Sequence, residues 1–359
     1  MKRSADTPLN EEAKIQRITT IDSKLSILDC WIYVVSFCRT REWIQLSYCC
    51  KSINELKFVG ELMKTKEKTL RYSLDRNEIS RYLSANTGTI HNIYIRGNTS
   101  FSEDHFPFLR EVNTLCYGSV RENAFCYLEN IQTLDISGSQ TKGNEFEFLK
   151  QLRTLNISEC GSLTDDCFEH LKELHTLDMR RCFQLNGTGF IHLKKLQVLT
   201  MRNCWGPTDT EIGHLKELRY LDVRWCDQIT GEAFKCLGKL HTLNISSCFQ
   251  ITGETFAYLP QLHTLDMGRC KGVTDDCFEH LKNIRYLVMN ECKQLTGEGF
   301  SHLEHIRTLE MLDCAGVKMD NLRKLKGVRK LYMAGCDQFK DIDSSVFEEM
   351  TKDMEEFIY

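Results

Sequence analysis

The side chains of this protein that are best suited to chemistry are its 18 cysteines and 11 histidines. Thiolates and imidazoles bind metal ions, or act as nucleophiles and bases, when several of them meet at one place. Here many of them recur in a single register of 22 residues instead, which predicts a repeated structural unit rather than a cluster around a substrate. The two columns are Cys160, Cys182, Cys204, Cys226, Cys248, Cys270, Cys292, Cys314 and Cys336, and His170, His192, His214, His280 and His302.

Motifs of known chemistry are absent from the sequence. It contains no glycine-rich phosphate loop, no G-x-S-x-G, no H-E-x-x-H, no C-x-x-C and no paired Cys/His zinc pattern. We therefore expect no catalytic residue, no metal and no cofactor, and we interpret the protein as one that is not an enzyme. Cys49 and Cys50 stand outside the column, and we expect them to be buried in a helix.

The elements that must position the columns are units of 22 residues. In the unit that starts at Thr154–Ser158, polar residues alternate with Leu155 and Ile157, which predicts a short strand with one buried face. Thr164 is placed to cap a helical turn whose first two residues are acidic. Phe168 and two leucines follow at three-residue spacing, and we expect them to face the strand layer.

The repeated unit reads L-x-x-L-x-[I/M/V]-x-x-C-x-x-[L/I/V]-T-[D/G]-x-x-F-x-x-L, which resembles a cysteine-containing leucine-rich repeat. The resemblance implies an α/β solenoid, a horseshoe with parallel strands on its concave face. A single unit cannot bury its flanks, so the array needs many copies and covered ends. Ile93, Leu115 and Leu134 are the expected strand positions of irregular first copies, spaced 22, 19 and then 21 residues up to Leu155.

The composition is that of an ordinary soluble protein. The chain has 359 residues, 42% apolar and 27% charged, with a formal net charge of −4, which gives little support for nucleic-acid binding. No apolar run reaches the about 20 residues of a membrane span, and residues 1–20 lack the apolar core of a signal peptide. Because the cysteine column is uninterrupted and odd in number, we expect reduced thiols in an intracellular protein, either cytoplasmic or nuclear.

Residues 21–58 have a different pattern, which predicts two short amphipathic helices in tandem. The stretch W-I-Y-V-V-S-F from Trp31 and the stretch L-S-Y-C-C-K-S-I-N-E-L from Leu46 resemble the two parts of an F-box. The sequence departs from the F-box pattern where Leu28 is followed by Asp29 instead of proline. The resemblance implies docking to a Skp-family adaptor and, through it, to a cullin. The side chains that it implies for this contact are Leu28, Trp31, Val35, Leu46 and Ile53.

The sequence predicts five segments in all. They are a flexible leader at 1–20, the F-box-like helical segment at 21–58, a transition with an irregular first coil at 59–92, leucine-rich repeats at 93–339 and a C-terminal cap at 340–359. Within the transition, the letters E-I-S-R-Y-L predict a helical half-repeat. Within the cap, the spacing of Ser344, Ser345, Phe347, Met350, Met354 and Phe357 predicts a closing acidic helix.

The outward positions of the repeats carry many arginines and aromatic residues. Arginine and tryptophan are over-represented at binding hot spots, and the resemblance implies that partners bind on the concave strand surface. Arginine forks suit an acidic or phosphorylated peptide. The alternative is solvated decoration, with Asp178 and Asp222 forming ion pairs of little energetic value. The predicted partner-binding residues are Arg180, Arg181, Phe183, Arg202, Trp205, Arg224, Trp225 and Phe249.

An F-box followed by leucine-rich repeats implies a substrate-recognition subunit of an SCF-type E3 ubiquitin ligase, acting in ubiquitin-dependent protein degradation. Its concave face would hold the target protein. The alternative is a non-catalytic scaffold or inhibitor unrelated to ubiquitin, in which residues 21–58 cap the first coil. The compact 22-residue unit also resembles F-box and repeat proteins of protists and large DNA viruses.

Overall fold

The computed structural model describes residues 76–85, 87, 91–95, 101–340, 351–352 and 354–358. The chain divides into two units, Met1–Glu61 and Leu62–Tyr359, and all the described residues belong to the second. The predictions for the leader and the F-box-like segment therefore lie outside the described residues. They include the expected adaptor-binding residues Leu28, Trp31, Val35, Leu46 and Ile53.

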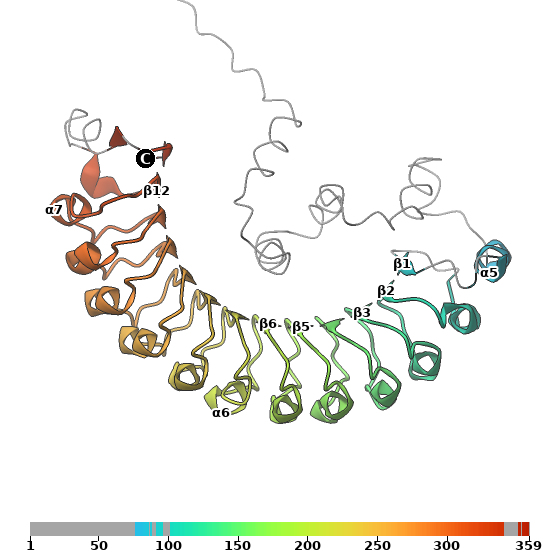
Figure 1. Ribbon diagram of the computed structural model, residues 1–359. Helices are drawn as coiled ribbons and strands as arrows, with labels where there is room; N and C mark the ends of the chain where they lie inside the picture. Colours follow the sequence, from blue (N-terminus) through green and yellow to red (C-terminus); the bar gives the residue numbers. More distant parts are fainter. Residues whose placement is uncertain are drawn as a thin grey trace, which may run out of the picture. The chain divides into compact units, whose positions relative to one another are not determined.

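The second unit is a leucine-rich-repeat solenoid, as the sequence predicts. Its described residues form one sheet of 13 parallel strands in sequential order, along the inner side of a curved array (Figure 1). Neighbouring strands pair in register, so that Leu155 lies opposite Leu177. The strands are β1 Asn92–Tyr94, β2 Thr114–Cys116, β3 Thr133–Asp135, β4 Thr154–Asn156, β5 Thr176–Asp178, β6 Val198–Thr200, β7 Tyr220–Asp222, β8 Thr242–Asn244, β9 Thr264–Asp266, β10 Tyr286–Val288, β11 Thr308–Glu310, β12 Lys330–Tyr332 and β13 Glu356–Ile358.

The outer side of the array consists of short helical turns, most of them 3₁₀ helices (Figure 1). A 22-residue unit leaves room for only one or two turns between strands, and short 3₁₀ pieces are the usual solution at that length. The helices are α5 Arg76–Ala85, η1 Glu103–Leu109, η2 Glu122–Tyr127, η3 Phe146–Phe148, η4 Asp165–His170, η5 Thr188–His192, α6 Asp209–Ile212, η6 Glu232–Cys236, η7 Gly253–Tyr258, η8 Asp275–His280, η9 Glu298–His302, α7 Met319–Leu322 and η10 Asp337–Phe339. None of the helices among the described residues has the length and apolarity needed to cross a membrane.

Every coil buries the same set of side chains between strand and helical turn. In the coil of β4, Leu155, Ile157, Leu163, Phe168 and Leu171 are all at most 1% exposed, which confirms the predicted inward faces. Each such side chain contributes roughly 1.5–3 kcal/mol on burial. Aromatic rings also continue from coil to coil, since the rings of Phe168 and Phe190 lie 5.9 Å apart.

The cysteine column ties successive coils together by hydrogen bonds. Cys226 Sγ donates to the Met201 carbonyl oxygen at 3.2 Å, and Cys248 Sγ donates to the Val223 carbonyl oxygen at 3.0 Å. All nine column thiols, which are buried, make the equivalent contact with the preceding coil. None of the nine column cysteines forms a disulfide in this structure.

The predicted cap of the helical turn is wrong in one respect. Thr164 occupies the N-cap position of η4, but its side chain makes no capping hydrogen bond. The N–H of Cys167 donates instead to the backbone carbonyl of Thr164 at 3.2 Å. The Asp165 carboxylate accepts the N–H of Gly187 in the next coil at 2.7 Å, so this aspartate joins two coils.

Both described ends of the array differ from the regular coils. The predicted helical half-repeat is present as α5, which buries Ile79 and Leu83, and β1 to β3 are centred on the predicted irregular positions. The predicted closing helix is wrong at Phe357, which is the central residue of β13 and lies opposite Leu331. An added strand hydrogen-bonds the backbone groups that the edge of β12 would otherwise leave unpaired. Met354 packs beside it on the core, and the cap residues 344, 345, 347 and 350 lie outside the described residues.

Candidate functional site

The turn that follows each strand has a fixed and strained geometry. The Cys182 N–H donates back to the Met179 carbonyl at 3.2 Å, and the Arg181 N–H donates forward to the Arg202 carbonyl at 3.0 Å. Arg181 has a φ of 57°, in the left-handed region, where a residue other than glycine costs roughly 1–2 kcal/mol. The same conformation recurs at Glu159, Asn203, Trp225, Ser247, Arg269, Glu291 and Asp313, and glycine takes it at Gly138 and Gly335.

This strained column points to a role for its side chains. Glycine meets the same backbone requirement at lower cost, as it does at Gly138 and Gly335. In three successive coils the chain carries Arg181, Asn203 and Trp225 at this position instead. Strained backbone positions concentrate at functional sites, so this column favours a surface whose side chains contact a partner.

Two arginines at the strand ends are held by aspartates two residues earlier. The Arg224 Nη2 atom lies 2.6 Å from Asp222 Oδ2, and the Arg224 Nε and backbone N–H donate to the same carboxylate. This pair is largely buried, with side-chain exposures of 25% for Arg224 and 1% for Asp222. Arg180 and Asp178 repeat the geometry at 2.7 Å. Burial raises the pKa of Asp178, although the hydrogen bond from Arg180 opposes that shift.

Arg202 stands between these two arginines and lacks their partner. The position two residues earlier is Thr200, a buried hydroxyl in place of the carboxylate. Among the described residues, no carboxylate lies within ion-pair distance of the Arg202 guanidinium. Burial lowers the pKa of Arg202, and the charges of Arg224, Arg181 and Arg180 lower it further, while the charge of Asp222 opposes the shift. This part of the concave face therefore has an excess of positive charge that an anionic partner would neutralise.

Four large aromatic side chains lie exposed on the same coils. Phe183 is 51% exposed, Trp205 65%, Trp225 43% and Phe249 40%. The rings of Phe183 and Trp205 lie 5.0 Å apart, and the Lys271 ammonium lies 5.5 Å from the Phe249 ring. Grouped apolar exposure next to charged residues is typical of a protein-binding surface.

The structure thus brings the eight predicted partner-binding residues together only in part. Arg180, Arg202 and Arg224 form one column, and Phe183 stacks with Trp205. The expected contact of these arginines with the aromatic rings is not seen among the described residues. Arg181 pairs instead with Glu159 at 3.0 Å, and two of the column arginines bind their aspartates.

Two further features of this surface are corrections to the sequence reasoning. Ser158, one of the polar residues expected to alternate outward with Leu155 and Ile157, is only 8% exposed. Lys271, which lies over Phe249, was missed. The left-handed column was missed as well, although Gly138 and Gly335 at the equivalent positions are a signal of it in the sequence.

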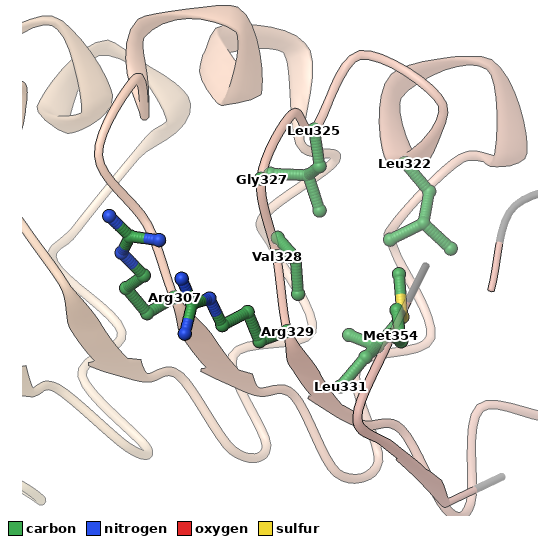
Figure 2. Close-up of a pocket in the computed structure, with 8 residues that line it drawn as sticks. All are labelled: Arg307, Leu322, Leu325, Gly327, Val328, Arg329, Leu331 and Met354. Atoms are coloured by element: carbon green, nitrogen blue, oxygen red, sulfur yellow. The ribbon is translucent and has the colours of Figure 1, made fainter. Parts of the chain in front are cut away.

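A second candidate is a pocket of about 350 Å³ at the C-terminal end of the array. Figure 2 shows its apolar side, with Leu322, Leu325 and Met354, and the two arginines Arg307 and Arg329 at its opposite side. Arg329 also pairs with Glu355 at 3.3 Å. No acidic residue is among the described residues that line this pocket.

The histidine column does not form a metal site. Its members stand at the ends of helical turns in separate coils, with His170 ending η4 and His192 ending η5. In the part of the chain that the structure describes, no three histidine, cysteine or acidic side chains are grouped so that they could hold a metal ion.

Comparisons with known proteins identify the fold. No family model matches the sequence, and no curated protein matches it. Among solved structures, the complex of Rad7 and Elc1 from yeast matches with a TM-score of 0.51, over 86% of this chain and 93% of the matched chain, at 16% identity. An internalin (InlF) from Listeria monocytogenes matches with a TM-score of 0.54, over 79% of this chain and 94% of its own, at 13% identity. The TLR13–ssRNA13 complex matches with a TM-score of 0.46, over 69% of this chain and 50% of the matched chain, at 17% identity.

At these identities the shared property is the fold. Together with the sheet order and the repeated core, it defines the unit Leu62–Tyr359 as a leucine-rich-repeat solenoid. Its curved sheet presents the arginine and aromatic surface described above.

Proposed function

We propose that this protein is the substrate-recognition subunit of an SCF-type E3 ubiquitin ligase, and that its concave face binds the target protein. The observation that carries the recognition part is Arg202, an unpaired cation between two arginines that are held by aspartates. Trp205, which follows Arg202 on the same turn, and Trp225, on the turn of the next coil, are both exposed. Arginine and tryptophan at the centre of a surface are the residue types that supply most binding energy in protein interfaces.

The target segment that this surface suits is acidic or phosphorylated. A guanidinium binds a carboxylate or phosphate through two parallel hydrogen bonds. Arg224 and Arg180 already use that capacity on Asp222 and Asp178, so Arg202 is the arginine of this column that remains available to a partner. The backbone of the turns is fixed by inter-coil hydrogen bonds, so little ordering is needed on binding.

The ligase part of the proposal rests on the F-box-like residues 21–58. In this proposal Leu28, Trp31, Val35, Leu46 and Ile53 contact a Skp-family adaptor, which links the protein to a cullin. The Rad7 structure, which shares the fold of the solenoid, was solved as a complex with Elc1. That complex supports looking for a partner here, and the intracellular location expected from the cysteine column agrees with this role.

The test is affinity capture from cell extract with the full chain and two double variants. Trp31→Ala with Leu46→Ala removes the F-box-like contacts, and Arg202→Ala with Trp225→Ala removes the concave contacts. A matched control, Arg323→Ala with Tyr258→Ala, removes an exposed arginine and an exposed aromatic residue elsewhere on the solenoid. Circular dichroism and urea unfolding establish that each variant is folded.

We expect the wild type and the control to recover adaptor, cullin and target. The first variant should lose adaptor and cullin but keep the target, and the second should show the reverse. If no variant or wild-type sample recovers an adaptor or a cullin while proteins still bind the solenoid, the ligase proposal is wrong. The non-catalytic scaffold or inhibitor then takes its place. Target binding that survives Arg202→Ala with Trp225→Ala would refute the concave surface.

A further inference from the structure

A second charged feature follows the opposite edge of the sheet, where the strands begin. The residue before each strand donates its backbone N–H to the same position of the preceding coil, as Arg285 does to His263 and Arg307 does to Arg285, both at 2.8 Å. These side chains are therefore stacked about one strand spacing, roughly 4.8 Å, apart. The rings of His241 and His263 show the stacking directly, with centroids 5.6 Å apart. From the fourth coil on, this column reads Arg153, His175, Gln197, Arg219, His241, His263, Arg285, Arg307 and Arg329.

The column two residues earlier supplies carboxylates to this edge, but only for part of its length. Lys195 pairs with Glu173 at 2.6 Å, and Lys239 pairs with Glu217 at 2.6 Å. In the next three coils the equivalent residues are Gln261, Asn283 and His305, none of which is acidic. The ion pairs within this column thus stop where the neighbouring column becomes most basic.

A pocket of about 270 Å³ lies at that place, lined by His263, Asn283, Arg285, His305 and Arg307, which we call the Arg–His pocket. No acidic residue lines it, and neither arginine has a carboxylate partner among the described residues. Burial lowers the pKa of His263, and the charge of Arg285 lowers it further. Figure 2 shows Arg307 beside Arg329 of the next coil, where pairing with Glu355 resumes.

We propose that the Arg–His pocket binds a compact ligand that carries two or more phosphoryl groups. Two guanidinium forks can each bind phosphate oxygens through paired hydrogen bonds. The His305 imidazole and the second N–H of the Asn283 amide, whose first N–H donates to the Pro260 carbonyl at 3.1 Å, can add donors, whereas His263 uses its Nδ1 on the Gln261 carbonyl at 2.6 Å. The volume is near the lower limit of small-molecule sites, about 300 Å³. Glu173 and Glu217 pair with Lys195 and Lys239, so the column two residues earlier carries no net charge in those coils. A continuous nucleic-acid backbone is a separate outcome of the test. This site is separate from the concave face and does not depend on the proposed ligase function.

The test is isothermal titration calorimetry of the full chain with inorganic tripolyphosphate at low ionic strength, where charge interactions are least screened. The test variant is Arg285→Gln with Arg307→Gln. The matched control is Arg153→Gln with Arg219→Gln, which changes the same column by the same charge outside the pocket. All four arginines project from the edge where the strands begin, and a urea unfolding curve for each variant verifies the fold.

We expect the wild type and the control to bind tripolyphosphate with equal Kd, and the test variant to bind at least about tenfold more weakly, the loss of one or two charge-assisted hydrogen bonds. An equal loss in the control variant would show diffuse attraction along the edge and overturn the pocket. No binding by the wild type would overturn it as well. Oligo(dT) that binds tighter than tripolyphosphate, and is weakened equally by both variants, would make the edge a nucleic-acid surface and refute the compact ligand.

Discussion

Because of its column of buried thiols, we expect the free energy of unfolding of this protein to fall steeply as the pH rises in the alkaline range. Burial raises the pKa of Cys160, Cys204 and Cys292 from 9.0 to about 11, and that of Cys226, Cys270 and Cys314 to about 12. The pKa values of Cys182, Cys248 and Cys336 are raised for the same reason. The folded state therefore keeps its thiols protonated at pH values where the unfolded chain loses those protons.

The sign and size of the effect follow from this difference. Below the unfolded pKa of 9.0, both states are protonated and the contribution to stability is fully present. As pH rises through that value, the unfolded chain ionises first, so the free energy of unfolding falls. Each thiol contributes a loss of about 1.4 kcal/mol between about pH 8 and about pH 10. The eight column thiols other than Cys336 together remove about 11 kcal/mol, which is comparable to the whole stability of a typical domain, about 5–15 kcal/mol.

The assay is urea unfolding of the reduced protein at a series of pH values across this range, followed by circular dichroism. We expect the free energy of unfolding to fall steeply above about pH 9 and the protein to be largely unfolded near about pH 10. Cys226→Ala should lower stability at neutral pH, because it leaves a cavity, and should reduce the alkaline loss of stability by about 1.4 kcal/mol. In the folded wild type near neutral pH, iodoacetamide should modify the exposed Cys236 and spare the column.

Two results would refute this reasoning. One is a free energy of unfolding that stays constant from about pH 8 to about pH 10, which would mean that the folded and unfolded thiols ionise alike. The other is alkylation of the column cysteines as fast as Cys236 in the folded protein, which would mean that the column is accessible to solvent.

Two further predictions concern the turns of the concave face. Asp222→Ala leaves Arg224 unpaired in a largely buried position and should lower the free energy of unfolding by about 3 kcal/mol. Glu217→Ala, which breaks the exposed pair with Lys239, should lower it by less than about 1 kcal/mol. Equal losses in urea unfolding would contradict the difference in burial between the two pairs. The Glu159→Gly variant should be more stable than Glu159→Ala by up to about 1 kcal/mol, because the backbone of residue 159 has a positive φ of 62°, in the left-handed region. Ala257→Gly, in the helical turn η7, should instead destabilise by about 0.5–1 kcal/mol, and a loss of stability at both positions would show that the left-handed turn carries no strain.

Much of the fold was predictable from local pattern. The leucines five residues before each column cysteine are the central residues of β4 to β12, and the irregular first copies were placed correctly at Ile93, Leu115 and Leu134. These predictions were correct because each coil contacts its two neighbours with the same faces. The polarity of a repeat position is therefore enough to predict whether its side chain points into the core or outward. Phe357 was placed in a helix because a short apolar pattern does not distinguish a strand from a helix. In the structure Phe357 belongs to β13, which pairs with the edge strand β12.

The site was predictable in its residue types but not in its electrostatics. The exposed aromatic residues and the arginines were all identified from spacing. Which arginine is available to a partner depends on Thr200, which replaces the aspartate found at 178 and 222, and on the charges of the coils on either side. The Arg–His pocket was likewise not predictable from spacing within one repeat, because its five lining residues belong to three coils.

The sequence by itself determined the period, the inward faces, the cysteine column and the candidate partner-binding residues, because these properties repeat within each 22-residue unit. Only the tertiary structure decided which charges are paired, which turns are left-handed and where a pocket lies. Those properties arise between units, where side chains 22 residues apart are brought to one strand spacing, about 4.8 Å, and an ion pair forms or fails according to both neighbours.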